Sequence, residues 1–204
     1  MSDDTQRELA AVAAALMVDE GLQGRRALQR AREQLRLPPR TPLPSPALIE
    51  AAVREHLAIF HAQTQPGELR ALRQTALAWM ERLAEFSPLL GGAVWHGTAT
   101  RLSDIHLQLF TDDPKAVEIA LLNAGLSYDA QTARGMRGRD TEVLRLAVPC
   151  AGLRERVDLY LWVNDTEAGR GARLPDALGR APRGTAAEVR TLLAAADSDP
   201  RNQE

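Results

Sequence analysis

The first 86 residues place apolar side chains with the period of an α-helix. Leu9, Val12 and Leu16 recur at spacings of three and four residues, which predicts an amphipathic helix near the start of the chain. The same period predicts further helices over about 24–36, 46–61 and 66–86. We expect the apolar positions of these helices to be buried, namely Leu9, Leu16, Leu28, Val53, Leu57, Phe60, Leu72 and Trp79.

After Pro88 the pattern changes to short apolar runs, glycines and alternation, which is typical of β-strands. Strands are predicted over 89–95, 105–110, 126–133, 142–148 and 154–163, and a helix after Asp113 and Pro114 separates the second strand from the third. Residues 165–185 are rich in Gly, Arg and Pro and indicate a loop, and Thr185 with Glu188 forms a capping box for a closing helix.

This order of elements predicts an α+β protein: an N-terminal helical region followed by a mixed β-sheet with flanking helices, and not an alternating parallel array. We divide the chain into a helical region over 1–86, an α/β core over 87–165, and a loop with a C-terminal helix over 166–204.

Composition is that of an ordinary soluble protein, with 45% apolar residues, 25% charged residues and a net charge of −2. The single cysteine, Cys150, excludes an intramolecular disulfide and a cysteine-based zinc site, and favours a reducing compartment. The acidic start lacks the basic and continuously apolar segments of a secretory signal, and no run approaches the roughly 20 apolar residues that span a bilayer. The expected location is the cytoplasm, with no membrane partner.

Positive charge is concentrated in residues 21–40, which carry six arginines and one glutamate. Such a cluster suits contact with nucleic-acid phosphates, but a solvated helix face is the alternative, because the aromatic side chains on which single-stranded bases stack are absent. The candidate contact residues are Arg25, Arg26, Arg30, Arg32 and Arg36. His56 and His61 lie five residues apart in a predicted helix, so we expect them on different faces and no paired-histidine metal motif.

The segment LLGGAVWHGTATRLSDIHLQLF, residues 89–110, carries the candidate chemistry. Positions 104 and 106 begin an alternating strand, so Asp104 and His106 project to the same side. Asp158 interrupts a strongly apolar strand, and an acid in that position faces solvent, a partner or a site. A glycine turn at Gly91 and Gly92 presents backbone N–H groups to which phosphates can bind.

This segment resembles the signature of the polymerase-β-like nucleotidyltransferase superfamily, including the minimal nucleotidyltransferases, in which a glycine turn precedes a Ser-Asp-x-Asp strand. The resemblance implies a nucleotidyltransferase-like fold and the transfer of a nucleoside monophosphate from an NTP to an unknown acceptor, with Mg²⁺ or Mn²⁺ as cofactor. It implies catalytic and metal-binding roles for Asp104, His106 and Asp158, and nucleotide contacts from Gly91, Gly92, Gly97, Thr98 and Ser103.

The sequence departs from the family pattern at the second carboxylate, where it has His106. Because Mg²⁺ prefers oxygen ligands, an imidazole here predicts reduced or lost activity. Two alternatives stay open at this point. One is a non-catalytic module that binds nucleotide, RNA or a protein partner on the same fold, and the other is an unrelated α+β domain with a coincidental glycine turn.

Overall fold

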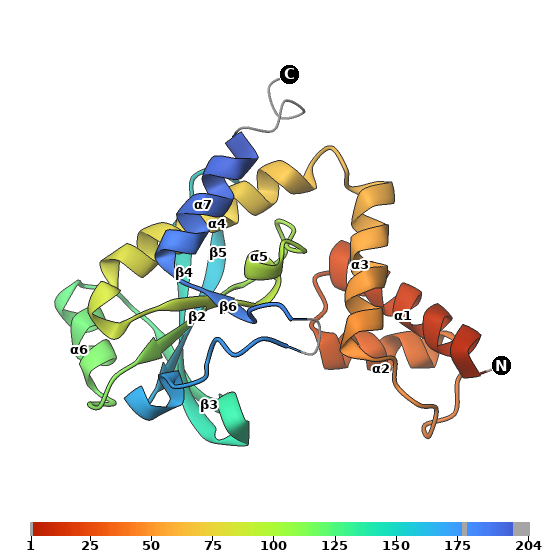
Figure 1. The fold of residues 1–204 in the computed structure, drawn as a ribbon, viewed down its shortest axis with the longest axis horizontal. Helices are drawn as coiled ribbons and strands as arrows, with labels where there is room; N and C mark the ends of the chain where they lie inside the picture. The colour runs from red at the N-terminus through yellow and green to blue at the C-terminus, as the bar shows by residue number, and fades with distance from the viewer. Residues whose placement is uncertain (1, 177–178, 198–204) are drawn as a thin grey trace. The chain divides into compact units, whose positions relative to one another are not determined.

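The computed structural model describes residues 2–176 and 179–197 (Figure 1). Residue 1 and parts of the predicted C-terminal segment, 177–178 and 198–204, lie outside the described residues. The chain forms two compact units. The first comprises residues Met1–Gly67 with Thr98–Leu102, and the second comprises Glu68–Gly97 with Ser103–Glu204. The sequence predicts a boundary at residue 86. The two units are instead divided near residue 67, because most of the fourth helix belongs to the second unit.

The first unit contains three of the predicted helices, α1 (Ser2–Asp19), α2 (Gly24–Gln34) and α3 (Pro46–Phe60). Helix α1 packs against both of the others through two rows of small and aliphatic side chains. Its contact with α2 buries Leu9, Ala13, Leu16, Ala27 and Ala31. Its contact with α3 buries Ala14, Val18, Val53 and Leu57.

Helix α3 begins and ends where the sequence contains capping signals. The side chain of Ser45 accepts a hydrogen bond from the backbone N–H of Leu48, and Pro46 occupies the first helical position. The helix ends at Phe60, which is 67% exposed, so its predicted burial is wrong. Phe60 lies at the last position of the helix, where its ring packs against the ring of His56 at 4.7 Å and not into the apolar row.

His56 and His61 also depart from the prediction that they lie on different faces. His61 follows the last residue of α3 and has φ −127° and ψ 15°, so it has already left the helical path. The Nε2 atoms of both histidines lie within 3.2 Å of the Asp19 carboxylate. The spacing rule for a helix face therefore does not apply to this pair.

The second unit is built on a six-stranded mixed sheet, with the strand order β3-β4-β5-β2-β1-β6. Strands β2 and β5 are parallel, and the other neighbouring pairs are antiparallel. The strands are β1 (Leu89–Gly91), β2 (Ile105–Phe110), β3 (Asp129–Arg134), β4 (Asp140–Cys150), β5 (Glu155–Asn164) and β6 (Arg183–Gly184). The predicted α+β class, with helices first and a mixed sheet with flanking helices after them, is confirmed.

One face of this sheet forms the core of the unit. Its strands alternate, and one set of side chains is fully buried, including Leu107, Leu109, Leu144, Leu159 and Leu161. Helices α4 (Gln65–Arg82) and α7 (Ala186–Asp197) lie side by side on this unit, joined by an ion pair of 2.7 Å between Arg190 and Glu81 (Figure 1). Thr75 of α4 donates a hydrogen bond to the buried Cys150 sulfur at 3.2 Å, which places α4 over the core face.

The segment after β1 differs from the predicted strand over 89–95. Strand β1 has three residues and is followed directly by a short helix, α5 (Gly92–His96). The change of direction occurs at Gly92, whose φ of +69° is disfavoured for residues with a Cβ. Helix α6 (Ala116–Asn123) occupies its predicted place. The described residues also form three short 3-10 helices, Ala84–Phe86, Met136–Gly138 and Thr166–Gly169. No helix within the described residues is both long and apolar enough to cross a membrane.

Candidate functional site

The second face of the sheet carries polar side chains from its two parallel strands. In the β2–β5 pairing, Ile105 lies opposite Leu159 and His106 lies opposite Tyr160. Asp104 and Asp158 directly precede the first of these pairs. Since alternate residues of a strand share a face, the register places Asp104, His106, Asp158 and Tyr160 on the same side of the sheet.

The glycine turn borders this polar face. Gly91 of β1 lies opposite His106 in the antiparallel pairing with β2. A Cβ atom added to Gly92 would lie 3.6 Å from Cδ2 of the His106 ring. The turn that is predicted to bind phosphate therefore lies next to β2, which carries His106 and begins directly after Asp104.

Asp158 is held by an arginine from the neighbouring strand β4. Arg145 lies opposite Tyr160 in the β4–β5 pairing, and its Nε and Nη2 donate to the Asp158 Oδ2 atom at 3.0 and 2.9 Å. Its Nη1 donates to Asp129 of β3 at 3.2 Å. The hydrogen bond and negative charge of Asp158 raise the pKa of Arg145. A cation already neutralises this carboxylate, so the protein supplies the charge that a metal ion would otherwise provide.

His106 is engaged by two aromatic neighbours from β5. The indole N–H of Trp162 donates to His106 Nδ1 at 3.1 Å, and the Tyr160 ring stacks on the imidazole with centroids 5.1 Å apart. Burial lowers the pKa of His106 to about 4, so the ring is neutral at physiological pH. Because Nδ1 accepts the indole hydrogen, the proton of the neutral ring lies on Nε2.

This hydrogen bond opposes a metal-ligand role for His106. A metal bound at Nε2 would move the ring proton to Nδ1, where it would face the Trp162 N–H. Together with the Arg145–Asp158 ion pair, this leaves the face poorly suited to the carboxylate-bound magnesium ions that the family resemblance implies. Within residues 2–176 and 179–197, the one trio of His, Cys, Asp or Glu with ligand atoms within 4.8 Å of one another lies elsewhere, at Asp19, His56 and His61.

The remaining residues implied by the resemblance lie at different places. Ser103 is half-buried next to Asp104. Gly97 ends α5 with a φ of +80°, and the Arg73 guanidinium donates to the carbonyl groups of Val94 and Trp95 in the same short helix. Thr98 begins the segment Thr98–Leu102, which belongs to the first unit.

Arg183 is a candidate residue that sequence reasoning missed. It lies in β6 opposite Gly91, and its Cγ would be 3.5 Å from a Cβ atom on that glycine. Its Nη1 donates to the carbonyl of Ala172 at 2.8 Å, and burial lowers its pKa. A half-buried arginine beside a glycine turn is well placed for an anion. No local signal pointed to it, because it belongs to the Gly-, Arg- and Pro-rich segment that predicted a loop.

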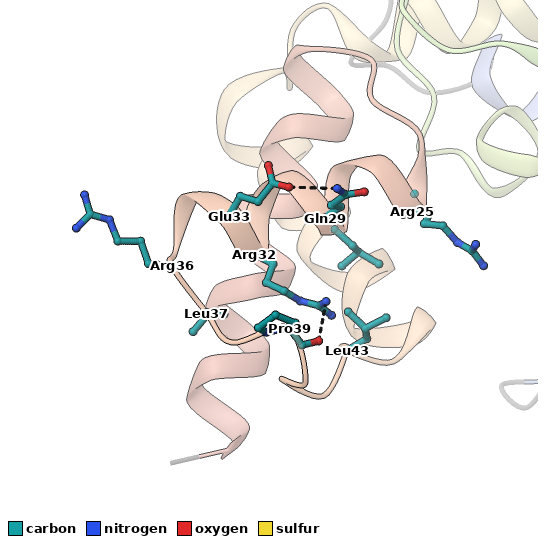
Figure 2. A pocket seen from close by; sticks show the side chains of 10 residues that line it. Arg25, Gln29, Arg32, Glu33, Arg36, Leu37, Pro39 and Leu43 are labelled. Atoms are coloured by element: carbon teal, nitrogen blue, oxygen red, sulfur yellow. Dashed lines mark hydrogen bonds between the residues drawn. The ribbon is translucent and has the colours of Figure 1, made fainter.

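Three arginines of the first unit, Arg25, Arg32 and Arg36, line a groove of about 840 Å³ on α2 and the chain that follows it (Figure 2). Arg25 and Arg36 extend outward, while Arg32 turns inward and donates to the Pro39 carbonyl at 3.0 Å (Figure 2). Leu28 and Leu43 give the groove an apolar wall. Arg26 and Arg30 are exposed on the same helix. Four of the five candidate arginines are therefore exposed to solvent, and Arg32 is committed to the fold of its own loop.

Comparisons with known proteins give structural matches of low sequence identity. A search of solved structures matches a cytoplasmic RNA terminal U-transferase at 16% identity, covering 50% of this chain and 32% of that one, with a TM-score of 0.33. It also matches the Cid1 poly(U) polymerase with MgGTP bound, at 16% identity over 52% of this chain and 34% of that one, again with a TM-score of 0.33. A third match is Cid1 with the UTP analogue UMPNPP, at 13% identity over 68% and 37% of the two chains and a TM-score of 0.31.

This chain spans about a third of the length of these matched proteins. The chain matches no protein-family model, and a search of curated proteins gives no match. At such low identity and TM-score, the matched proteins do not indicate the chemistry of this chain. We infer its chemistry from its own residues.

Proposed function

We propose that the sheet unit is a nucleotidyltransferase-like module that binds a nucleoside triphosphate and has reduced or lost transferase activity. Nucleotide binding would use the turn at Gly91 and Gly92, with Arg183 as a cationic partner for the phosphates. The site would lie on the polar face that carries Asp104, His106 and Asp158. The proposal also includes a cytoplasmic location for the protein, an acceptor for the nucleoside monophosphate, and RNA as a candidate partner.

The main support for reduced or lost transferase activity is the ion pair between Arg145 and Asp158. In a two-metal mechanism, carboxylates hold the ions that neutralise the reacting phosphates. Here one acid is paired with a guanidinium, and the position of a second is taken by a neutral imidazole whose Nδ1 is occupied. Asp104 is then the remaining acid of the proposed trio.

Binding without transfer is supported by the positive groups around the turn. Arg183 is half-buried, and a partly desolvated guanidinium interacts more strongly with an anion than one in bulk water. The residue at position 92 has no side chain to obstruct an approaching phosphate. These features do not require a metal ion, so we expect nucleotide affinity to survive in its absence.

Calorimetric titration with each of the four nucleoside triphosphates, in Mg²⁺, in Mn²⁺ and in EDTA, tests the proposal. We expect binding of at least one triphosphate in all three conditions, and little release of pyrophosphate. Arg183→Gln should weaken binding about tenfold or more, which corresponds to one charge-assisted contact. Arg190→Gln, which removes an exposed arginine from α7, should leave it unchanged.

Two results would contradict the proposal in different ways. Robust Mg²⁺-dependent release of pyrophosphate by the wild-type protein would show an active enzyme and refute the loss of transfer. Failure of every triphosphate to bind would refute the nucleotide site and favour the protein- or RNA-binding alternative.

A further inference from the structure

Three side chains with metal-ligating atoms converge in the first unit. None of them belongs to the candidate site on the sheet. Asp19 is the last residue of α1, His56 lies in the last turns of α3, and His61 follows the end of α3. The His61 Nε2 atom lies 2.8 Å from Asp19 Oδ1, and the His56 Nε2 atom lies 3.0 Å from Asp19 Oδ2. All three ligand atoms lie within 4.8 Å of one another.

The packing of α1 on α3 creates this convergence. The apolar row of Ala14, Val18, Val53 and Leu57 joins the two helices along their lengths, and the contacts of Asp19 bring their C-terminal ends together. In an ideal helix, residues five apart are rotated by about 140° around the axis. His61 does not follow this rotation, because its φ of −127° turns the chain out of the helix. Its ring therefore approaches that of His56, with centroids 5.8 Å apart.

The electrostatic environment favours a cation at this position. The C-terminal end of a helix carries a partial negative charge, and here the C-terminal ends of α1 and α3 meet. A carboxylate at the last position of α1 adds to that negative charge, and the last turns of both helices contain no Lys or Arg.

The donor set selects the class of metal. Two imidazole nitrogens and one carboxylate oxygen suit zinc and its first-row neighbours, whereas magnesium and calcium prefer oxygen ligands alone. Ligand atoms around a tetrahedral zinc ion lie about 3.3 Å apart, given bond lengths of about 2.0 to 2.1 Å. The separations of 2.8 to 3.2 Å between the Asp19 carboxylate oxygens and the two histidine Nε2 atoms are close to that spacing.

We propose that Asp19, His56 and His61 form a zinc-binding site with three protein ligands and a fourth position open to water. The exposure of the three side chains, 47%, 15% and 28%, leaves room for that water. On binding, each Nε2 donates its lone pair to the metal in place of its hydrogen bond to Asp19, and the ring proton resides on Nδ1. The site is independent of the nucleotide-binding proposal, because it lies wholly in the helical unit.

Titration of the full-length, tag-free and chelator-treated protein with Zn²⁺ tests this site. We expect one equivalent to bind by calorimetry, and the midpoint of thermal unfolding to rise with Zn²⁺ because the ion binds only the folded site. Substitution with Co²⁺ should give the visible absorption of a four-coordinate ion. Asp19→Asn and His61→Gln should each weaken Zn²⁺ binding at least tenfold.

Matched controls separate this site from general surface binding. Glu20→Gln removes the neighbouring acid, and His96→Gln removes a histidine of the other unit, and both should leave Zn²⁺ binding unchanged. Far-UV circular dichroism verifies that each variant is folded. Absence of Zn²⁺ binding in the wild-type protein would overturn the proposal and leave the histidines as hydrogen-bond donors to Asp19. Equal Zn²⁺ affinity in the wild-type protein, Asp19→Asn and His61→Gln would overturn it as well.

Discussion

His106 contributes to the pH dependence of stability. Its pKa is about 4 in the folded protein, compared with 6.5 for an unperturbed histidine. Below pH 6.5 the unfolded chain therefore takes up a proton that the folded chain resists, so the free energy of unfolding should fall as the pH drops toward 4. The full contribution corresponds to about 3 kcal/mol. Below pH 4 both states are protonated at this residue and its contribution no longer changes.

Replacing His106 by Gln isolates this effect, because an amide oxygen can still accept the Trp162 N–H but does not titrate. Urea unfolding of both proteins between pH 7 and 4 gives the difference in their pH slopes, and carboxylates common to both cancel. We expect the stability of wild type to fall more steeply than that of His106→Gln. Parallel slopes would show that the imidazole is protonated without cost in the folded protein.

At this scale the sequence predicted which residues share a face but not what they contact. Strand alternation was enough to predict that Asp104, His106 and Asp158 lie on one side of the sheet, in agreement with the β2–β5 register. Their partners depend on strand pairing, because Arg145 reaches Asp158 only through the β4–β5 register. Similarly, His61 was assigned to the wrong face because helical spacing was applied one residue beyond the end of the helix.

At the scale of elements, β6 depends on the absence of a side chain at Gly184. A Cβ atom there would lie 2.0 Å from the ring of Trp95 in α5, whose indole N–H donates to the carbonyl of Ala181 at 2.8 Å. Gly184→Ala should therefore displace either α5 or β6 and lower the free energy of unfolding by about 1 to 3 kcal/mol. Chemical denaturation of the variant and of the wild-type protein measures this loss.

Gly67→Ala in α4 is the matched control for this change. A Cβ atom at Gly67 would have no neighbour within 4 Å, and alanine is the better helix former, so we expect a gain of up to about 1 kcal/mol. Replacing glycine by alanine restricts the unfolded chain and by itself favours the folded state. An equal loss at Gly67, where a Cβ meets nothing, would therefore argue against the contact with Trp95 as the specific cause of the loss at Gly184.

The closing helix provides a second prediction at this scale, because its capping box was visible in the sequence. The Thr185 hydroxyl accepts from the Glu188 backbone N–H, and Glu188 in turn accepts from the Thr185 N–H at 2.7 Å. Thr185→Ala should lower the free energy of unfolding by about 1 kcal/mol. Thr191→Ala, farther along the same helix, should cost less in the same denaturant series, and equal losses would argue against the cap.

Long helices and most strands were predictable because periodicity and caps are local properties. The strand at 105–110 matches β2, and α3 begins at the Ser45 cap. The five-residue α5 and the two-residue β6 were missed, since they are too short to show a period. Their formation depends on pairing with β1 and on the packing of Trp95, which involve residues about 90 positions apart.

At the scale of the whole molecule, the net charge is −2, but positive charge is concentrated in one segment of the chain. Residues 21–40 carry six arginines and one glutamate, and Arg25, Arg26 and Arg30 are exposed on α2. If this patch contacts RNA, each arginine on a phosphate displaces about 0.7 of a counterion from a single strand. Changing all three to Gln should weaken binding to a short single-stranded RNA and reduce the slope of log affinity against log salt by about 2.

The control for this experiment removes the same charge from other exposed arginines of the chain. Arg7, Arg54 and Arg190 each form an ion pair with an acid, and all three are at least 49% exposed at the side chain. Replacing these three by Gln lowers the net charge equally, so it reproduces any effect of the overall field on association. Binding measured by fluorescence anisotropy at several salt concentrations gives both slopes. A smaller slope only in the α2 variant would assign RNA contact to that helix, whereas equal slopes in both variants and the wild-type protein would leave these arginines as a solvated helix face.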